Sequence, residues 1–452
     1  MGEAVAAPMA TRRSTMTAHD VHATTNQQPV VQLVNRLLMD AVTAGASDVH
    51  LEAQEHGLRV RYRIDGVLQE VPPPPASARE TIVSRLKVMA ELDITERRQA
   101  HDGRARLMIG GRELDVRVST LPSLHGESVV LRLLDTARRP MGLEQLGMAA
   151  DTLEALRRCA AQPHGVLLTT GPTGSGKTST LYALVERISS GREKIVSVED
   201  PVEYELPGVV QVPVRERGGV TFDRALRSML RHDPDVLLVG ELRDPETVEV
   251  CMQAALTGHL VLSTLHTNDA PSALTRLLDL GVAPYLVGST VEAVLAQRLT
   301  RRLCGECAVG IAAPEGVREE MARDGVEGDV IRIAVGCPAC RGTGYRGRTG
   351  IFELLLVDDE IRDAVNRRDG AGQLRRLALE HGMRPLRADG WRQVVAGVTT
   401  VEEVRRVLPA GLGSLLPPRP AAAPRRRSRT RPPAASKAGV PAAPPAAAAT
   451  DS

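Results

Sequence analysis

Aromatic residues are scarce in this chain: one Trp, five Tyr and two Phe make up 2% of its 452 residues. Proteins that bind single-stranded nucleic acid stack bases on aromatic rings, and few rings are available here. Net positive charge is also small, because 57 Lys and Arg are set against 55 Asp and Glu. Both features lower the expectation of a nucleic-acid motor, which usually concentrates positive charge on a folded face.

Long apolar runs are missing as well. No uninterrupted apolar stretch approaches the roughly 20 residues that span a bilayer. Arg12 and Arg13 are not followed by the apolar stretch of a secretory signal. We therefore expect a cytoplasmic protein. In that compartment, six cysteines favour metal binding or simple packing over disulfides.

Charge and proline are unevenly distributed. The last 44 residues hold seven Lys or Arg, one Asp and 10 of the 30 prolines, a surplus of +6 that leaves the rest near −4 because the whole chain carries +2. Such a segment cannot bury enough apolar surface to fold, so we predict a disordered tail at 409–452. The polar, aperiodic residues 1–27 predict a disordered leader. The arginines at 425–429 suit anionic lipid, or they simply keep the protein in solution.

Hydrophobic periodicity divides the remainder into two domains and predicts an α/β fold class. Residues 30–44 and 80–93 predict helices, and residues 58–64 alternate apolar side chains with Arg, as in a half-buried strand. Hairpin signals at 65–66 and 110–111 place further strands at 67–71, 104–109, 113–120 and 128–134. We predict a small α/β domain at 28–135 and a linker at 136–147. In a second domain at 148–408, apolar strands alternate with helices, which is typical of a parallel sheet covered by helices.

The second domain contains the phosphate-loop (Walker A) pattern G-x-x-x-x-G-K-[ST]. Its residues are Gly171, Pro172, Thr173, Gly174, Ser175, Gly176, Lys177 and Thr178. Glycines let backbone N–H groups converge on phosphate oxygens, Lys177 is placed to reach the β- and γ-phosphates, and the Thr178 hydroxyl is a ligand for Mg²⁺. An apolar run precedes the loop and helical periodicity follows it, so we predict an ATP and Mg²⁺ site.

Three further segments follow in order. Residues 195–203 end a strand with the carboxylates Glu199, Asp200 and Glu203; residues 233–241 form an apolar strand that closes on Glu241, as in a Walker B segment; and His259 and His266 flank an apolar run. Acidic groups at the carboxyl ends of parallel strands lie beside the phosphate loop, where they hold Mg²⁺ or orient water.

Each of these segments alone also has a structural explanation. Carboxylates at strand ends are often only solvated or cap a helix, and an isolated buried histidine is more often bonded to a backbone carbonyl. Their order behind an intact phosphate loop favours chemistry.

Two Cys-x-x-Cys pairs, Cys304 with Cys307 and Cys337 with Cys340, are separated by 29 residues. Four thiolates complete the tetrahedral coordination of Zn²⁺ and leave no open position for water, so the zinc is expected to be structural. A redox pair is the alternative, although a thioredoxin-like setting is absent. Cys159 and Cys251 have no such neighbours in the sequence.

In combination these motifs resemble the secretion ATPase superfamily, and within it the assembly ATPases of type II secretion and type IV pili, the GspE/PulE family. The resemblance covers residues 30–408. It rests on the phosphate loop, an Asp box at 199–203, the Walker B segment with Glu241, a His box at 259–266 and, in the small domain, the segments 47–52, 63–66, 102–104 and 117–122. The cysteine pairs and residues 344–353 are similar to the assembly class, whereas pilus retraction ATPases lack such a cysteine module.

The resemblance implies a PAS-like small domain, a RecA-like ATPase domain with a zinc-binding insert at 304–340, and a homo-hexamer with ATP between subunits. It implies that Arg104 and Arg117 approach the phosphates, a role suited to a guanidinium; a pair of surface arginines is the alternative. Glu241 is the expected catalytic carboxylate, Glu203 a second candidate for polarising water, and Glu199 a candidate nucleotide-site carboxylate. His259 and His266 are expected to sense the γ-phosphate.

The resemblance implies ATP hydrolysis that powers pseudopilus or pilus assembly, and type II protein secretion is the first expectation. It also implies that the protein works at the inner face of the cytoplasmic membrane, attached through an inner-membrane platform protein. Many relatives carry a further N-terminal domain that docks to that machinery, whereas only the leader precedes the small domain here, so the docking route stays open. A nucleic-acid motor for DNA uptake or transfer and a nucleotide-binding scaffold with little turnover are the other classes; no nucleic-acid partner is expected.

Overall fold

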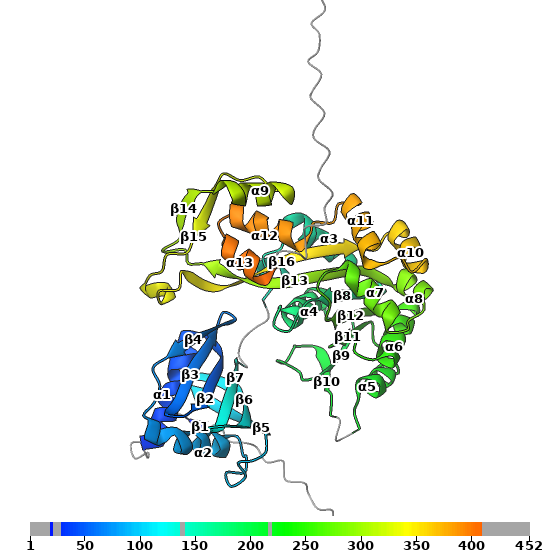
Figure 1. Cartoon of the computed structure of the whole chain (residues 1–452). Coiled ribbons are helices and arrows are strands. Elements are labelled where there is room, and N and C mark those ends of the chain that lie inside the picture. Colours follow the sequence, from blue (N-terminus) through cyan, green and yellow to red (C-terminus); the bar gives the residue numbers. More distant parts are fainter. Residues whose placement is uncertain (1–18, 21–28, 136–140, 216–218, 409–452) are drawn as a thin grey trace, which may run out of the picture. The chain divides into compact units, whose positions relative to one another are not determined.

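The computed structural model describes residues 19–20, 29–135, 141–215 and 219–408 (Figure 1). Most of the predicted leader, the first part of the predicted linker and the whole predicted tail lie outside the described residues. Among the described residues, no helix combines the length and apolarity needed to cross a membrane.

The small domain is a seven-stranded sheet with two helices. The strand order is β1-β5-β6-β7-β2-β3-β4, and every pair is antiparallel except β1 with β5. Its elements are β1 (His19–Asp20), α1 (Pro29–Ala44), β2 (Ala46–Gln54), β3 (Gly57–Ile64), β4 (Val67–Val71), α2 (Arg79–Met89), β5 (His101–Ile109), β6 (Arg112–Ser123) and β7 (Gly126–Asp135).

One face of this sheet is apolar and forms the domain core with the two helices. Val34 and Leu38 of α1 and Ile82 of α2 are buried in the same cluster as Leu107 of β5 and Leu131 of β7. Side chains alternate between the two faces of a strand, so the polar residues of these strands, including most of its arginines, lie on the opposite face. The helices therefore cover one face and leave a charged face on the other.

The second domain is built on another seven-stranded sheet, in the order β10-β9-β11-β12-β8-β13-β16. All neighbours are parallel except β13 with β16. The strands are β8 (Gly165–Thr170), β9 (Ile195–Glu199), β10 (Val209–Pro213), β11 (Val236–Val239), β12 (Leu260–Leu265), β13 (Val291–Leu303) and β16 (Tyr345–Leu356). Every residue of β8, β9, β11 and β12 is buried, as expected for a parallel sheet with both faces covered.

Helices cover both faces of this sheet (Figure 1). On one face, α3 (Ala150–Ala160) and α4 (Lys177–Ile188) pack with Leu167 of β8; on the other, α5 to α8 and α10 to α13 contribute to the cluster that contains Val166 and Leu168. The latter helices are α5 (Phe222–Met229), α6 (Pro245–Leu256), α7 (Pro271–Asp279), α8 (Pro284–Thr290), α10 (Asp359–Asn366), α11 (Ala371–Glu380), α12 (Leu386–Val395) and α13 (Val401–Val407).

A small insert separates β13 from β16. It consists of β14 (Val309–Ala312), α9 (Glu315–Arg323) and β15 (Val330–Ile333), and β14 pairs with β15 antiparallel. The four clustered cysteines lie at the two ends of this insert. The backbone N–H of Cys304 donates to the carbonyl of Gly344 at 2.9 Å, so the insert leaves and rejoins the sheet at one place.

Candidate nucleotide and metal sites

The phosphate loop connects β8 to α4 at the carboxyl end of the sheet. Gly171, Gly174 and Gly176 have φ of 151°, 78° and 92°, and residues with a Cβ rarely adopt such backbone angles. At Gly171 a Cβ would also lie 2.6 Å from the Oγ of Ser175 and from the carbonyl oxygen of Gln297. The predicted loop and its flanking strand and helix are therefore present as the motif requires.

Lys177 begins α4 and folds back over the loop. Its ammonium group donates to the carbonyl oxygens of Gly171 at 2.8 Å and Pro172 at 3.3 Å. Burial lowers the pKa of Lys177 to about 8, while the negative charge of Glu241 opposes the shift. The charges of Lys177 and Glu241 therefore act on each other, although the two residues are 64 positions apart in the chain.

Glu241 follows β11 and His266 follows β12, the neighbouring strand. The Nε2 of His266 lies 3.6 Å from Oε2 of Glu241, whose other oxygen pairs with Arg243 at 2.5 Å. The Glu241 side chain is 14% exposed, so it is mostly buried but still accessible to solvent. Burial and the charge of Lys177 lower the pKa of His266, which favours the neutral imidazole.

Strand order explains why these three residues meet. β12 lies between β11 and β8 and is parallel to both, so the residues that follow these three strands all lie at the carboxyl edge of the sheet, where the strands end. Parallel α/β sheets bind ligands at this edge. The backbone N–H of Leu242 donates to the carbonyl of Thr264 at 3.0 Å, which fixes the segment after β11 against β12.

Glu199 is the last residue of β9 and is almost fully buried, at 3% exposed. Its carboxylate accepts hydrogen bonds from the hydroxyls of Tyr182 and Ser197 and from the amide of Gln211. The Tyr182 hydroxyl also accepts the backbone N–H of Glu203 at 3.4 Å. Glu199 thus anchors the segment that carries Glu203, and its predicted place among the nucleotide-site carboxylates stays a prediction.

His259 precedes β12 and lies at the opposite edge of the sheet from His266. Its Nδ1 is 2.9 Å from the carbonyl oxygen of Ala254 and 3.3 Å from the hydroxyl of Thr257. The six residues of β12 lie between the two histidines, which are therefore about 23 Å apart at roughly 3.3 Å per residue step. The structure does not bring His259 to the phosphate loop of its own chain, and its part in nucleotide sensing stays a prediction.

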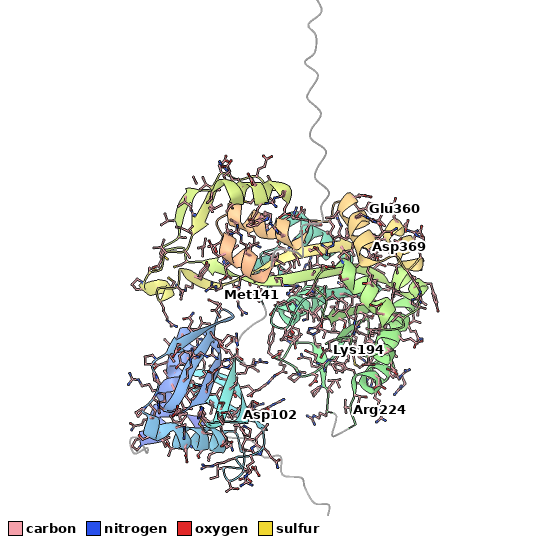
Figure 2. All side chains as sticks on the ribbon, viewed as in Figure 1. Asp102, Met141, Lys194, Arg224, Glu360 and Asp369 are labelled. Carbon is pink, nitrogen blue, oxygen red and sulfur yellow. The ribbon has the colours of Figure 1, made fainter. Side chains whose placement is uncertain are left out.

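Arg104 of β5 and Arg117 of β6 lie directly opposite each other in the small domain, and Arg117 in turn lies opposite Arg132 of β7. Asp102, labelled in Figure 2, marks the start of this stretch of β5. Directly opposed residues project from the same face of a sheet, and like charges in that position destabilise it. Asp48 accepts a hydrogen bond from Arg132 at 3.1 Å. The row of arginines is thus a place where an anion would relieve repulsion.

The four paired cysteines converge. Their sulfur atoms all lie within 4.8 Å of one another, and three of the separations are 3.8, 3.8 and 3.7 Å. Tetrahedral Zn²⁺ with bonds of about 2.3 Å needs sulfur atoms about 3.8 Å apart, so the cluster fits that ion. Although burial raises the pKa of Cys340, N–H donors of Cys337 and Gly344 bring it to about 6, which favours the thiolate.

One residue missed by the sequence analysis supports the phosphate loop from the neighbouring strand β13. The side chain of Gln297, in β13, donates to the carbonyl of Ser175 at 2.8 Å and accepts from the hydroxyl of Thr180 at 2.8 Å. Gln297 is 2% exposed. Gln297 and Arg298 directly follow the apolar run 293–296 of β13. This polar pair is the signal in the sequence that could have indicated the support, since buried polar groups need partners.

Comparison with known proteins gives a family assignment. The family model described as "Type II/IV secretion system protein" matches residues 23–406. The chain belongs to this family. It is 50% identical over 388 residues to the type II secretion system protein HxcR of Pseudomonas aeruginosa, covering 86% of this chain and 79% of that one. It is 47% identical over 392 residues to the type II secretion system ATPase E of Vibrio cholerae, covering 86% and 77%.

Solved structures show the same fold at lower identity. The ATPase DotB of Yersinia pseudotuberculosis superposes with a TM-score of 0.64 at 18% identity, covering 85% of this chain and 96% of that one. The pilus retraction motor PilT with bound ADP gives 0.56 at 23% identity, covering 83% and 97%. The predicted fold class is confirmed: a small α/β domain with a RecA-like P-loop domain and a four-cysteine module. The resemblance to this secretion family is confirmed as well.

Proposed function

We propose that the protein is an ATP hydrolase that powers pseudopilus assembly in type II protein secretion, working as a homo-hexamer. The observation that carries the proposal is the convergence of Lys177, Glu241 and His266 at the carboxyl edge of three adjacent strands, in a chain about half identical to type II secretion proteins. Pilus extension by the same chemistry is the nearest variant of this function.

The chemical roles follow from position. Loop N–H groups and Lys177 would hold the β- and γ-phosphates, and Thr178, in the first turn of α4, would be a ligand of Mg²⁺, which neutralises phosphate charge when bound. Glu241 would accept a proton from the attacking water. Neutral His266, 3.6 Å from Glu241, would donate to the γ-phosphate and register its loss. Glu203, held through Tyr182, is the second carboxylate that could orient water.

Arg104 and Arg117 would complete the site from the small domain of a neighbouring subunit, because guanidinium groups neutralise charge on the transferring phosphoryl group. Their direct opposition across β5 and β6 favours an anion between them. The four-cysteine cluster would hold a structural Zn²⁺. It would close the insert onto the ends of β13 and β16 rather than take part in chemistry, since four thiolates leave no open position.

Mechanical output would require a membrane partner. We propose that the ring works at the inner face of the cytoplasmic membrane, against a platform protein that extracts pilin-like subunits. The supporting observation is the shared family, because relatives of about 50% identity are named for type II secretion.

One experiment separates this function from a nucleic-acid motor. Phosphate release would be measured on the full chain with liposomes carrying the platform protein, with empty liposomes, and with single-stranded DNA. We expect stimulation only by the platform protein. Stimulation by DNA alone would replace the proposal with the motor, and no release in any condition would favour the scaffold.

A further inference from the structure

Residues 267–270, which join His266 to α7, are held by side chains from four other elements. The contacts are Thr267 N to Thr170 Oγ1 at 2.8 Å, Asn268 O to the Arg298 guanidinium at 2.8 Å, Asp269 to Arg375 at 2.5 Å, and Ala270 N to Glu353 Oε1 at 2.8 Å. The four partners come from β8, β13, α11 and β16. Each residue of the segment is thus held by another element. Thr267 is held by the strand that enters the phosphate loop, and Asp269 is held by the C-terminal helix α11.

Four of these groups form a charge-balanced cluster in the interior. Glu353 is 2% exposed and Arg298 7%, while the side chains of Asp269 and Arg375 are 14% and 18% exposed. In the β13–β16 ladder, Ala296 faces Glu353 and Arg298 faces Ile351, which puts Arg298 and Glu353 on one face. Buried charges are tolerated when they are paired and hydrogen-bonded, and here two positive and two negative groups act on one another.

Glu353 has a second contact, which reaches another helix. While one carboxylate oxygen accepts the N–H of Ala270, directly before α7, the other accepts the N–H of Leu386, the first residue of α12, at 3.2 Å. A negative charge is favourable at a helix N-terminus, and this single carboxylate serves two. A movement of the segment after β12 therefore acts on α12 through one side chain, and on α11 through Asp269 and Arg375.

The position of His266 gives this linkage a function. His266 is next to the clamped segment and lies 3.6 Å from Glu241, and Thr170 is the last residue of the strand that enters the phosphate loop. We propose that Glu353 is a positioning residue that sets His266 beside Glu241 and transmits its nucleotide-dependent movement to α11 and α12. The inference rests on the proposed ATP site.

A matched control is available in Glu403. It is 1% exposed, and it also ties a helix to β13, through the backbone N–H and the guanidinium of Arg301. Among the described residues, its carboxylate bonds to Arg301 and Arg406 and to neither residues 266–270 nor the phosphate loop. Glu353→Gln and Glu403→Gln each remove one buried charge, so a purely structural role predicts similar effects for both.

The test compares the two variants in the full chain. For Glu353→Gln we expect kcat to fall about tenfold or more while KM for ATP stays within about twofold, because the phosphate loop is untouched. For Glu403→Gln we expect a lower melting temperature with unchanged kcat. Arg375→Gln, at a less buried position, should reproduce the loss of kcat if Glu353→Gln folds poorly. Equal kcat in the Glu353 and Glu403 variants would overturn the proposal.

A second measurement does not depend on turnover. Hydrogen exchange of residues 371–395 would be followed with and without the non-hydrolysable analogue AMPPNP and Mg²⁺. We expect the analogue to slow exchange there in the wild type and in Glu403→Gln, but not in Glu353→Gln, although all three bind it. Protection that persists in Glu353→Gln contradicts the coupling. A wild type that binds the analogue but releases no phosphate would instead defeat only the proposed function.

Discussion

The amide of Gln297 donates a 2.8 Å hydrogen bond to the carbonyl oxygen of Ser175, in the middle of the phosphate loop. Two residues 122 positions apart are thereby joined beneath the candidate nucleotide site. The same side chain accepts a hydrogen bond from the hydroxyl of Thr180 in α4, so the loop and the start of α4 are both held from β13. The shape of the loop depends on this support as well as on its own glycines.

Gln297→Met should weaken nucleotide binding. It keeps the volume but leaves a buried carbonyl and a buried hydroxyl without partners, which costs about 1–3 kcal/mol for each group. We expect lower stability and a higher Kd for Mg²⁺–ATP, measured by calorimetry. Gln393 is equally buried but donates to Gly147 and Gly350 instead. Gln393→Met should lose stability with Kd unchanged, and a similar Kd change in both variants would refute the assignment.

Glu241→Gln should separate binding from hydrolysis. A general base contributes about 10²–10⁴-fold to the rate, so phosphate release should fall by at least about 100-fold. Nucleotide affinity should be kept or improved, because one negative charge near the phosphates is removed. Single-turnover kinetics and equilibrium binding on the same preparation check both points. Turnover close to wild type would remove Glu241 from this role.

Nucleotide binding should weaken above pH 8. Burial lowers the pKa of Lys177 from 10.5 to about 8, so the nucleotide-free amine loses its proton above that pH, whereas bound phosphate favours the charged form. Binding then takes up a proton, and Kd should rise up to about tenfold per pH unit. Lys177→Ala should bind weakly without this slope; the same slope in both proteins would assign it to another group.

The stability contribution of Lys177 has the opposite sign. Between pH 8 and 10.5 the unfolded lysine keeps its proton while the folded one has lost it, so unfolding takes up a proton and this group stabilises the fold as pH rises through that window. The wild type should therefore gain stability relative to Lys177→Ala from pH 7.5 to pH 9.5 in denaturant titrations. A relative loss over that range would contradict the lowered pKa.

The cysteine cluster should hold one Zn²⁺ per chain. Cys340→Ser should lose the metal and lower the melting temperature, because the ion closes the insert between β13 and β16. Cys159→Ser is the control, since Cys159 lies outside the cluster and its variant should keep the metal. Elemental analysis and thermal unfolding with and without chelator give both readouts. Full zinc content in Cys340→Ser would exclude the four-thiolate site.

Arg104 and Arg117 should act between subunits. Arg117→Ala should lower turnover by about 10³-fold, the lower end for a phosphate-directed arginine, while Arg106→Ala, on the same strand face as Arg104, should have little effect. An equal mixture of Arg117→Ala and Lys177→Ala chains should regain activity, because each supplies the group that the other lacks. If mixing restores nothing, the arginines do not work in a neighbouring subunit.

The candidate nucleotide site can be read from the sequence, whereas the residues that support it cannot. The glycine spacing before Lys177 follows from phosphate geometry alone, and the apolar runs that end on Glu241 or precede His266 identify parallel strands. Contacts of Gln297 and Glu353 join segments far apart in the chain, so no local pattern contains them. The helix predicted at 80–93 ends earlier, at Met89, because the chain turns at Glu91, whose φ is 58° and lies outside the helical region.

The most direct test is steady-state phosphate release by the purified full-length oligomer at saturating Mg²⁺–ATP, with the platform protein in liposomes, beside Lys177→Ala. We predict Mg²⁺-dependent turnover that the substitution abolishes. No release by the wild type, or equal release by both proteins, would contradict the assignment of residues 171–178 as the site where ATP is bound and hydrolysed.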